Sequence, residues 1–190
     1  MISVIIPTIN EEKTIARVVS LALRAKAVTE VIVIDDKSLD RTVEAAKEAG
    51  ASIITSTKIG KGASMKDGLL VAHNDIIVYL DGDISNYADD VVEKMAEPLI
   101  RDEADFVKST FGREAGRVTE LVAKPLLSLL MPEALKFSQP LSGIIAGRKS
   151  FFEKIEFEND YGVDIGILLD MLKTGARIKE VNIGRIENKM

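Results

Sequence analysis

The chain has 190 residues, of which 46% are apolar and 29% charged, a composition typical of one soluble globular domain. Its formal net charge of −5 argues against nucleic acid as a partner, and the lack of cysteine excludes disulfides and thiolate metal sites. The sequence shows no signal-peptide pattern at its start and no apolar run near the about 20 residues of a membrane span. We therefore expect a cytoplasmic protein without a transmembrane segment.

In the first half of the chain, short β-branched runs alternate with longer helical patterns. Strands are predicted over 3–7, 30–35, 51–55 and 75–80, and helices over 11–25, over 41–49 and from the Gly60-Lys61-Gly62 loop to about residue 73. The strands are continuously apolar, which is typical of a parallel sheet covered on both faces. This order predicts right-handed strand–helix–strand crossovers, and sheets of this kind bind ligands outside the carboxyl ends of their strands.

The pattern changes after residue 100. Strands are predicted over 105–110, 142–147 and 177–183, a helix over 161–173, and over 112–118 a glycine- and arginine-rich loop that opens a helix. No repeat, low-complexity tract or linker interrupts the chain. We expect one domain with two halves, 1–100 and 101–190.

Asp81-Gly82-Asp83 follows directly on the apolar strand predicted over 75–80. Two carboxylates this close repel each other, and a cation between them would remove the conflict. Hard oxygen ligands suit Mg²⁺ or Mn²⁺, which can hold a diphosphate and stabilise the charge that develops as it departs. A solvated Asp-Gly turn is the structural alternative, but the place at the end of a strand favours the metal site.

Three other segments have both a structural and a functional interpretation. Asp35 ends a strand and can accept hydrogen bonds from a base or ribose, whereas Ser38 or Asp40 can cap the next helix. Lys61, between two glycines, lacks the spacing of a phosphate-binding P-loop but lies where it can meet a phosphate or a base. Thr8 or Asn10 is expected to cap the first helix, and the negative charge of Glu11 stabilises the positive end of that helix. These structural roles are enough to explain the segment without a functional one.

Several segments resemble a known family. VIIPTINEE, VIVIDDKSLDRT, GKGASMKDGL and VYLDGD occur in the order found in GT-A fold glycosyltransferases of the family-2 type. In the second half, GREAGRVTELVAKPLLSLLMPE, QPLSGIIAGRKSFF and YGVDIGILLD are similar to glucosyl-3-phosphoglycerate synthases. The resemblance implies a Rossmann-like α/β fold of the GT-A type, with a mostly parallel sheet and helices on both faces.

The resemblance also implies an activity. The expected reaction transfers a sugar, expected to be glucose, from a nucleotide-sugar such as UDP-glucose. The expected acceptor is a small phosphorylated molecule, 3-phosphoglycerate, and the expected cofactor is Mg²⁺ or Mn²⁺. Residues 1–100 would then bind the nucleotide-sugar and residues 101–190 the acceptor, and a homodimer is a further expectation.

Roles of single residues follow from the resemblance by position. The donor nucleotide would contact Pro7, Thr8, Ile9, Asn10, Glu11, Asp35 or Ser38, Lys61, Asp81 and Gly82. The metal would be held by Asp83 together with Asp81, and Asp164 would lie beside the donor sugar. Gly116, Arg117 and Thr119 would hold the acceptor, since a planar guanidinium binds phosphate or carboxylate through two parallel hydrogen bonds. The expected catalytic residues are Asp83, Asp164 and Arg117.

Two positions depart from the family pattern. Ile144 stands where the family commonly has glutamate, and Asn188 stands where its third metal-site residue is histidine. Asparagine can offer a carbonyl oxygen to Mg²⁺ but is a weaker ligand than imidazole for softer ions. A polyprenyl-phosphate sugar transferase and a non-catalytic nucleotide-sugar-binding protein remain alternatives. A nucleotidyltransferase is disfavoured because its glycine-rich phosphate loop does not follow the first strand.

Overall fold

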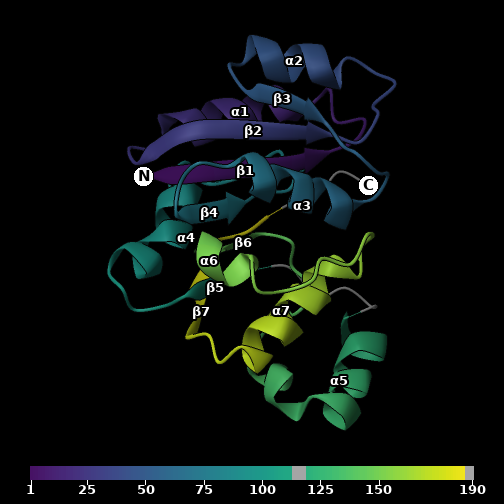
Figure 1. Ribbon diagram of the computed structural model, residues 1–190, viewed down its shortest axis with the longest axis vertical. Coiled ribbons are helices and arrows are strands. Elements are labelled where there is room, and N and C mark those ends of the chain that lie inside the picture. The colour runs from purple at the N-terminus through teal and green to yellow at the C-terminus, as the bar shows by residue number, and fades with distance from the viewer. Residues whose placement is uncertain (113–118, 187–190) are drawn as a thin grey trace.

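The computed structural model describes residues 1–112 and 119–186, which form a seven-stranded sheet covered by helices on both faces (Figure 1). The strands are β1 (Ile2–Thr8), β2 (Val28–Asp35), β3 (Ser52–Thr55), β4 (Ile76–Tyr79), β5 (Phe106–Thr110), β6 (Ile145–Arg148) and β7 (Ile178–Asn182). Their order across the sheet is β3-β2-β1-β4-β6-β5-β7. Only β6 runs antiparallel to its neighbours, β4 and β5. The predicted mostly parallel sheet is confirmed.

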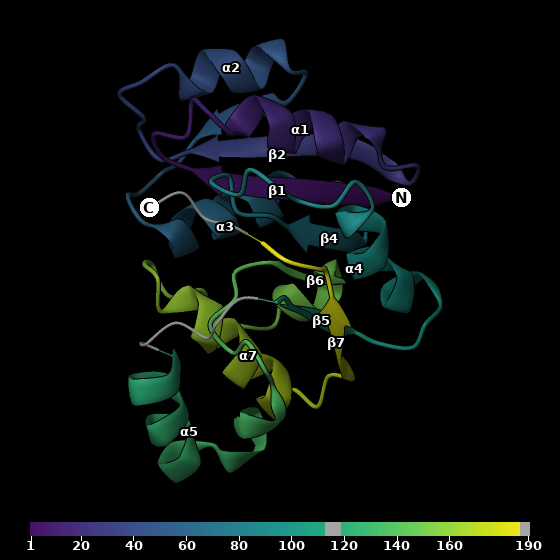
Figure 2. The ribbon, with the colours of Figure 1, turned by 180° about the vertical axis from the view of Figure 1, so that it is seen from behind.

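The helices divide between the two faces of the sheet (Figures 1 and 2). One face is covered by α1 (Ile15–Arg24), α2 (Thr42–Glu48) and α4 (Val91–Ile100), the other by α3 (Lys61–Val71), α6 (Lys149–Phe152) and α7 (Val163–Lys173). The π-helical turn η1 (Thr119–Ala123), helix α5 (Lys124–Leu130) and the 3₁₀ helix η2 (Pro132–Lys136) extend below the sheet in Figure 1. Within the described parts of the chain, no helix is long and apolar enough to cross a membrane.

The central strand β1 shows why its sequence is continuously apolar. Val4 and Ile6 point into the core beneath α1 and α4, whereas Ile5 points into the core beneath α3 and α7. Side chains alternate between the faces of a strand, so a strand covered on both sides needs apolar residues at every position. The two cores hold the carboxyl ends of β1, β2 and β4 along one edge of the sheet.

Helix α1 begins at Ile15, four residues later than predicted. The segment before it is held instead by the loop after β2: the Asn10 side chain accepts a hydrogen bond from the Leu39 amide at 2.8 Å, and the Glu11 amide donates to Thr42 at 2.7 Å. The predicted cap by Thr8 or Asn10 was therefore wrong, because the Asn10 side chain serves another loop.

Helix α4 and the direction of β6 were not predicted from the sequence. Pro98 and the polar residues before Val91 obscured α4, although Val91, Val92, Met95, Ala96 and Leu99 form its buried face. The strand predicted over 142–147 begins only at Ile145, since residues 142–144 leave the sheet and line a cavity.

Candidate active site

A cavity of about 490 Å³ lies at the carboxyl edge of the sheet, next to the first turns of α3 and α7. Its walls come from both halves of the chain. The predicted site residues that line it are Pro7, Thr8, Ile9, Glu11, Lys61, Asp81, Gly82, Asp83 and Asp164. The structure therefore brings together, in one cavity, motifs that are separated by more than a hundred positions in the sequence.

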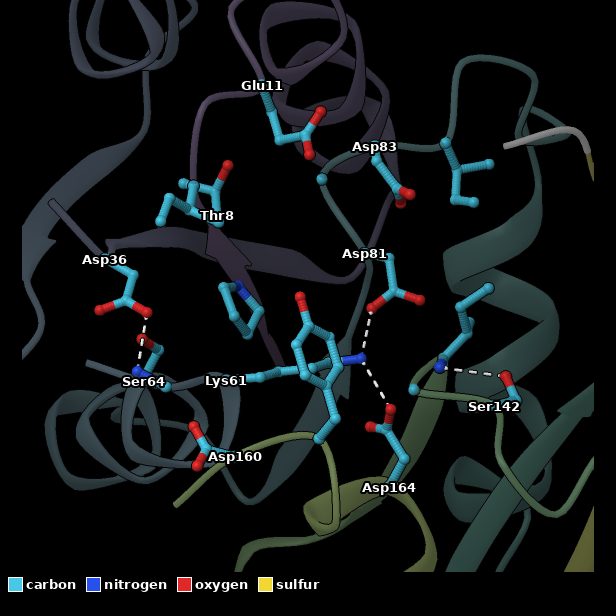
Figure 3. A pocket seen from close by; sticks show the side chains of 18 of the residues that line it. Thr8, Glu11, Asp36, Lys61, Ser64, Asp81, Asp83, Ser142, Asp160 and Asp164 are labelled. Carbon is cyan, nitrogen blue, oxygen red and sulfur yellow. Dashed lines mark hydrogen bonds and ion pairs between the residues drawn. The ribbon is translucent and has the colours of Figure 1, made fainter. Parts of the chain in front are cut away.

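An ion cluster occupies the middle of this cavity (Figure 3). The Lys61 Nζ atom lies 2.9 Å from Asp81 Oδ1 and 3.0 Å from Asp164 Oδ2. Burial lowers the pKa of the Lys61 ammonium, but the two carboxylates outweigh burial and raise the pKa above its ordinary value. Burial raises the pKa of Asp164; Lys61 opposes this rise and Asp81 adds to it. Lys61 therefore stays positively charged and bridges Asp81, from the first half of the chain, and Asp164, from the second half.

The backbone of the turn after β4 is fixed by a tyrosine side chain. The Tyr87 hydroxyl accepts a hydrogen bond from the Asp81 amide at 3.0 Å and donates to the Asp81 carbonyl at 3.2 Å. Gly82 allows a close approach to β1, because a Cβ atom there would lie 3.1 Å from Thr8 Oγ1. Asp81 and Asp83 consequently face the cavity in a defined geometry (Figure 3).

The carboxylates of Asp83 and Glu11 both line the cavity and give it a negatively charged region. Burial raises the pKa of Glu11, and the nearby Asp83 raises it further. A cation would relieve this repulsion. Among the described residues no three His, Cys, Asp or Glu side chains form a ready-made metal site. The residues therefore fit an ion such as Mg²⁺ that takes one or two carboxylates and completes its shell with phosphate and water oxygens.

Unpartnered polar atoms mark the cavity as a ligand site. Five buried side-chain atoms in the described part of the chain lack a hydrogen-bond partner, and four of them belong to cavity residues: Thr8 Oγ1, Asp36 Oδ1, Ser64 Oγ and Asp164 Oδ1. Buried polar groups are nearly always hydrogen-bonded in native proteins. A ligand rich in hydroxyl, amide or phosphate groups would satisfy these atoms.

The end of β2 presents a different carboxylate from the one expected. Both Asp35 oxygens accept from the Ser38 amide, at 3.2 and 3.3 Å, and neither residue lines the cavity. Asp36 lines it instead, with one oxygen held by the Gly60 amide at 2.8 Å. Adjacent side chains at a strand end point in different directions, so Asp36 faces the cavity while the predicted nucleotide contact of Asp35 stays a prediction.

Several predicted residues cannot be assigned to the cavity. Asn10 is engaged by the loop after β2, and Thr119 is a buried residue of η1 that does not line the cavity. Gly116, Arg117 and Asn188 lie outside the described residues. Conversely, sequence reasoning missed Ser64, Ser142, Gly143, Asp160 and Tyr161 as lining residues. Ile144, which replaces the family's glutamate, also lines the cavity, so this departure lies within the site.

The fold and the cavity define a class of protein. A mostly parallel sheet with an acidic turn after β4, a buried lysine and a polar cavity at the carboxyl edge is the arrangement expected of a GT-A nucleotide-sugar-binding domain. The profile described as "Glycosyl transferase family 2" matches residues 3–154. The chain therefore belongs to glycosyl transferase family 2.

Individual relatives agree with the narrower resemblance. Glucosyl-3-phosphoglycerate synthase of Petrotoga mobilis is 38% identical over 203 residues, covering 93% of this chain and 62% of the relative. The protein of the same name from Mycolicibacterium smegmatis is 35% identical over 207 residues, covering 96% of this chain and 68% of the relative. The chain thus spans roughly two thirds of the length of these relatives.

A solved structure shows the same fold. Glucosyl-3-phosphoglycerate synthase from Mycobacterium tuberculosis in complex with Mn²⁺, UDP-glucose and phosphoglyceric acid has a TM-score of 0.95 and 34% identity. The match covers 100% of this chain and 72% of that one. The predicted GT-A fold and the predicted family resemblance are confirmed.

Proposed function

We propose that this protein is a metal-dependent glucosyltransferase that uses UDP-glucose as donor and 3-phosphoglycerate as acceptor. One observation carries the proposal: a cavity holding the Lys61 cation, the Asp83 carboxylate and four unpartnered polar atoms lies at the carboxyl edge of the sheet. The chain is 34% identical to a synthase that was solved with Mn²⁺, UDP-glucose and phosphoglyceric acid.

The donor half supplies charge for the diphosphate. Asp83 would hold Mg²⁺ or Mn²⁺, with Glu11 nearby and Asn188 as a further proposed ligand outside the described residues. When bound, the ion neutralises charge on the departing diphosphate. Lys61 contributes a second positive charge whose position is fixed by Asp81 and Asp164. We assign Asp36 to the nucleoside, because its Oδ1 atom is buried and lacks a partner.

The acceptor half would position the sugar and the phosphoglycerate. Asp164 Oδ2 is bound by Lys61, whereas Oδ1 has no hydrogen-bond partner and can accept one from a sugar hydroxyl. Gly116, Arg117 and Thr119 remain the proposed acceptor residues on the strength of the family resemblance. Cytoplasmic location and a homodimer also stay predictions.

Calorimetry and a turnover assay test the proposal. UDP-glucose should bind in Mg²⁺ and bind far more weakly in EDTA, and 3-phosphoglycerate should stimulate UDP release more than a polyprenyl phosphate does. Lys61→Met should weaken UDP-glucose binding, while Lys66→Met, on the exposed side of the same helix, should not. Binding without turnover would indicate a non-catalytic binding protein. Equal affinity in EDTA and Mg²⁺ would contradict the metal-dependent mechanism.

A further inference from the structure

Lys108 is a cation in the core of the second half. It lies on β5, in the middle of the sheet region formed by β6, β5 and β7, and is 0% exposed. Its Nζ atom donates hydrogen bonds to the backbone carbonyls of Ser142, at 2.7 Å, and Asp164, at 3.0 Å. Within the described residues no carboxylate forms a salt bridge with it.

A lysine is an expensive choice for this position. Lysines are almost never fully buried unless they are paired, because removing an ammonium from water is costly. Burial lowers the pKa of Lys108 to about 8, although the Asp164 charge opposes the shift. The preceding core-facing residue of β5, Phe106, is apolar. An apolar residue at this position would avoid the cost of burying a charge, so the demands of core packing do not explain a lysine here.

The two carbonyls that Lys108 binds belong to two walls of the cavity. Ser142 precedes Gly143 in the segment leading to β6, and Asp164 lies in the first turn of α7. Gly143 packs against the ion cluster: a Cβ atom there would lie 2.2 Å from Lys61 Nζ and 2.9 Å from Asp164 Oδ1. The separation of these two segments therefore decides where the Asp164 carboxylate is held, whereas Lys61 is also held by Asp81 from the other half.

We infer that Lys108 is a positioning residue, which clamps the Ser142-Gly143 segment to the first turn of α7 and thereby sets the geometry of the sugar-facing side of the cavity. The inference rests on the proposed function, since it concerns the same cavity. Lys108 does not line the cavity and acts through Asp164 and Gly143. The nucleotide side, built on β1 and β2, does not depend on this clamp.

Lys149 provides a matched control. Its Nζ atom also donates to a backbone carbonyl, that of Ala72, at 2.7 Å. Lys149 follows β6 and its amide bonds to Asp75, just before β4, so it lies at the edge of the sheet opposite the cavity. Lys149→Met removes a similar hydrogen bond without touching the proposed clamp.

Turnover per UDP-binding site separates positioning from simple destabilisation. UDP-binding sites are counted by calorimetry, and kcat for UDP-glucose with 3-phosphoglycerate is divided by that count. Lys108→Met should lower this kcat by about 10- to 100-fold, the effect of a small misplacement of reacting groups, while the Kd for UDP stays within about twofold. Lys108→Arg, which keeps charge and donors, should recover part of the loss, and Lys149→Met should leave turnover per site unchanged.

Hydrogen exchange gives a readout that does not need activity. Lys108→Met should speed amide exchange in residues 142–147 and 161–168 but leave residues 7–12 unchanged. Unaltered exchange in both segments together with unaltered turnover per site would overturn the inference. If Lys108→Met and Lys108→Gln both lost all UDP-binding sites, Lys108 would be structural and the inference would also be wrong. A wild-type protein that does not turn over UDP-glucose would refute the proposed function, and the exchange comparison would still test the clamp.

Discussion

The proposed donor half, residues 1–100, and the proposed acceptor half, residues 101–190, build their parts of the cavity by different means. In the donor half, the lining residues follow parallel strands whose register aligns their ends: Thr8 pairs with Asp35, and Ile5 with Tyr79 just before the acidic turn. In the acceptor half, β6 runs in the opposite direction, so residues before the strand face the cavity rather than residues after it.

This difference has a physical consequence. The strands of the donor half are aligned by backbone hydrogen bonds of the parallel sheet, and the Tyr87 hydroxyl fixes the backbone of the acidic turn. The cavity-lining segments of the acceptor half lie outside its strands and are held by side-chain contacts, among them Lys61 with Asp164, Lys108 with two carbonyls and Ser109 with Ser142. Substitutions in the donor half should therefore remove chemistry without moving the walls, whereas substitutions in the acceptor half should move a wall.

The largest effect is expected in the donor half, at Asp83. Asp83→Ala should lower kcat/KM by about 10²–10³-fold, because the carboxylate proposed to hold the ion against the diphosphate would be lost. Binding of UDP should become weak and insensitive to Mg²⁺, as measured by calorimetry with and without EDTA. Asp89→Ala, which removes an exposed carboxylate near Arg24, should change neither quantity. Metal-dependent binding that survives in Asp83→Ala would remove Asp83 from the metal site.

A smaller and more selective effect is expected in the acceptor half, at Arg117. Arg117→Ala should raise the KM for 3-phosphoglycerate by roughly 30- to 150-fold, equivalent to about 2–3 kcal/mol for a charge-assisted contact. The KM for UDP-glucose should change little, and Arg101→Ala, at the exposed residue directly after α4, should change neither constant. Steady-state kinetics with both substrates varied would measure this split. A parallel rise of both KM values would instead make Arg117 a structural residue.

The same contrast explains what could be predicted from the sequence. The parallel strands, the acidic turn and Lys61 were predictable because apolar runs and strand ends follow rules of local pattern. That Asp36 rather than Asp35 lines the cavity was not, since it depends on the Ser38 amide that binds Asp35. Lys108, Ser142 and Gly143 were missed because their roles arise from contacts between segments far apart in the chain.

The contact between the halves is tested most finely at Gly143. A Cβ atom at this position would lie 2.2 Å from Lys61 Nζ, and 2.9 Å from both Asp164 Oδ1 and Asp81 Oδ1. These are ends of flexible side chains, so Gly143→Ala should displace the ion cluster and cost little stability. Gly166→Ala is the matched control, because its Cβ would meet only Glu158 Cγ at an ordinary 3.5 Å.

We expect Gly143→Ala to lower kcat by about tenfold, a partial misplacement by comparison with the about 100-fold possible for a full ångström. Its unfolding midpoint in urea should stay close to that of the wild type. Because Lys61 would be pushed from between Asp81 and Asp164, the affinity for UDP should also change, unlike in Lys108→Met. If Gly143→Ala kept wild-type turnover and UDP affinity, the close packing of the two halves around Lys61 would have no part in catalysis.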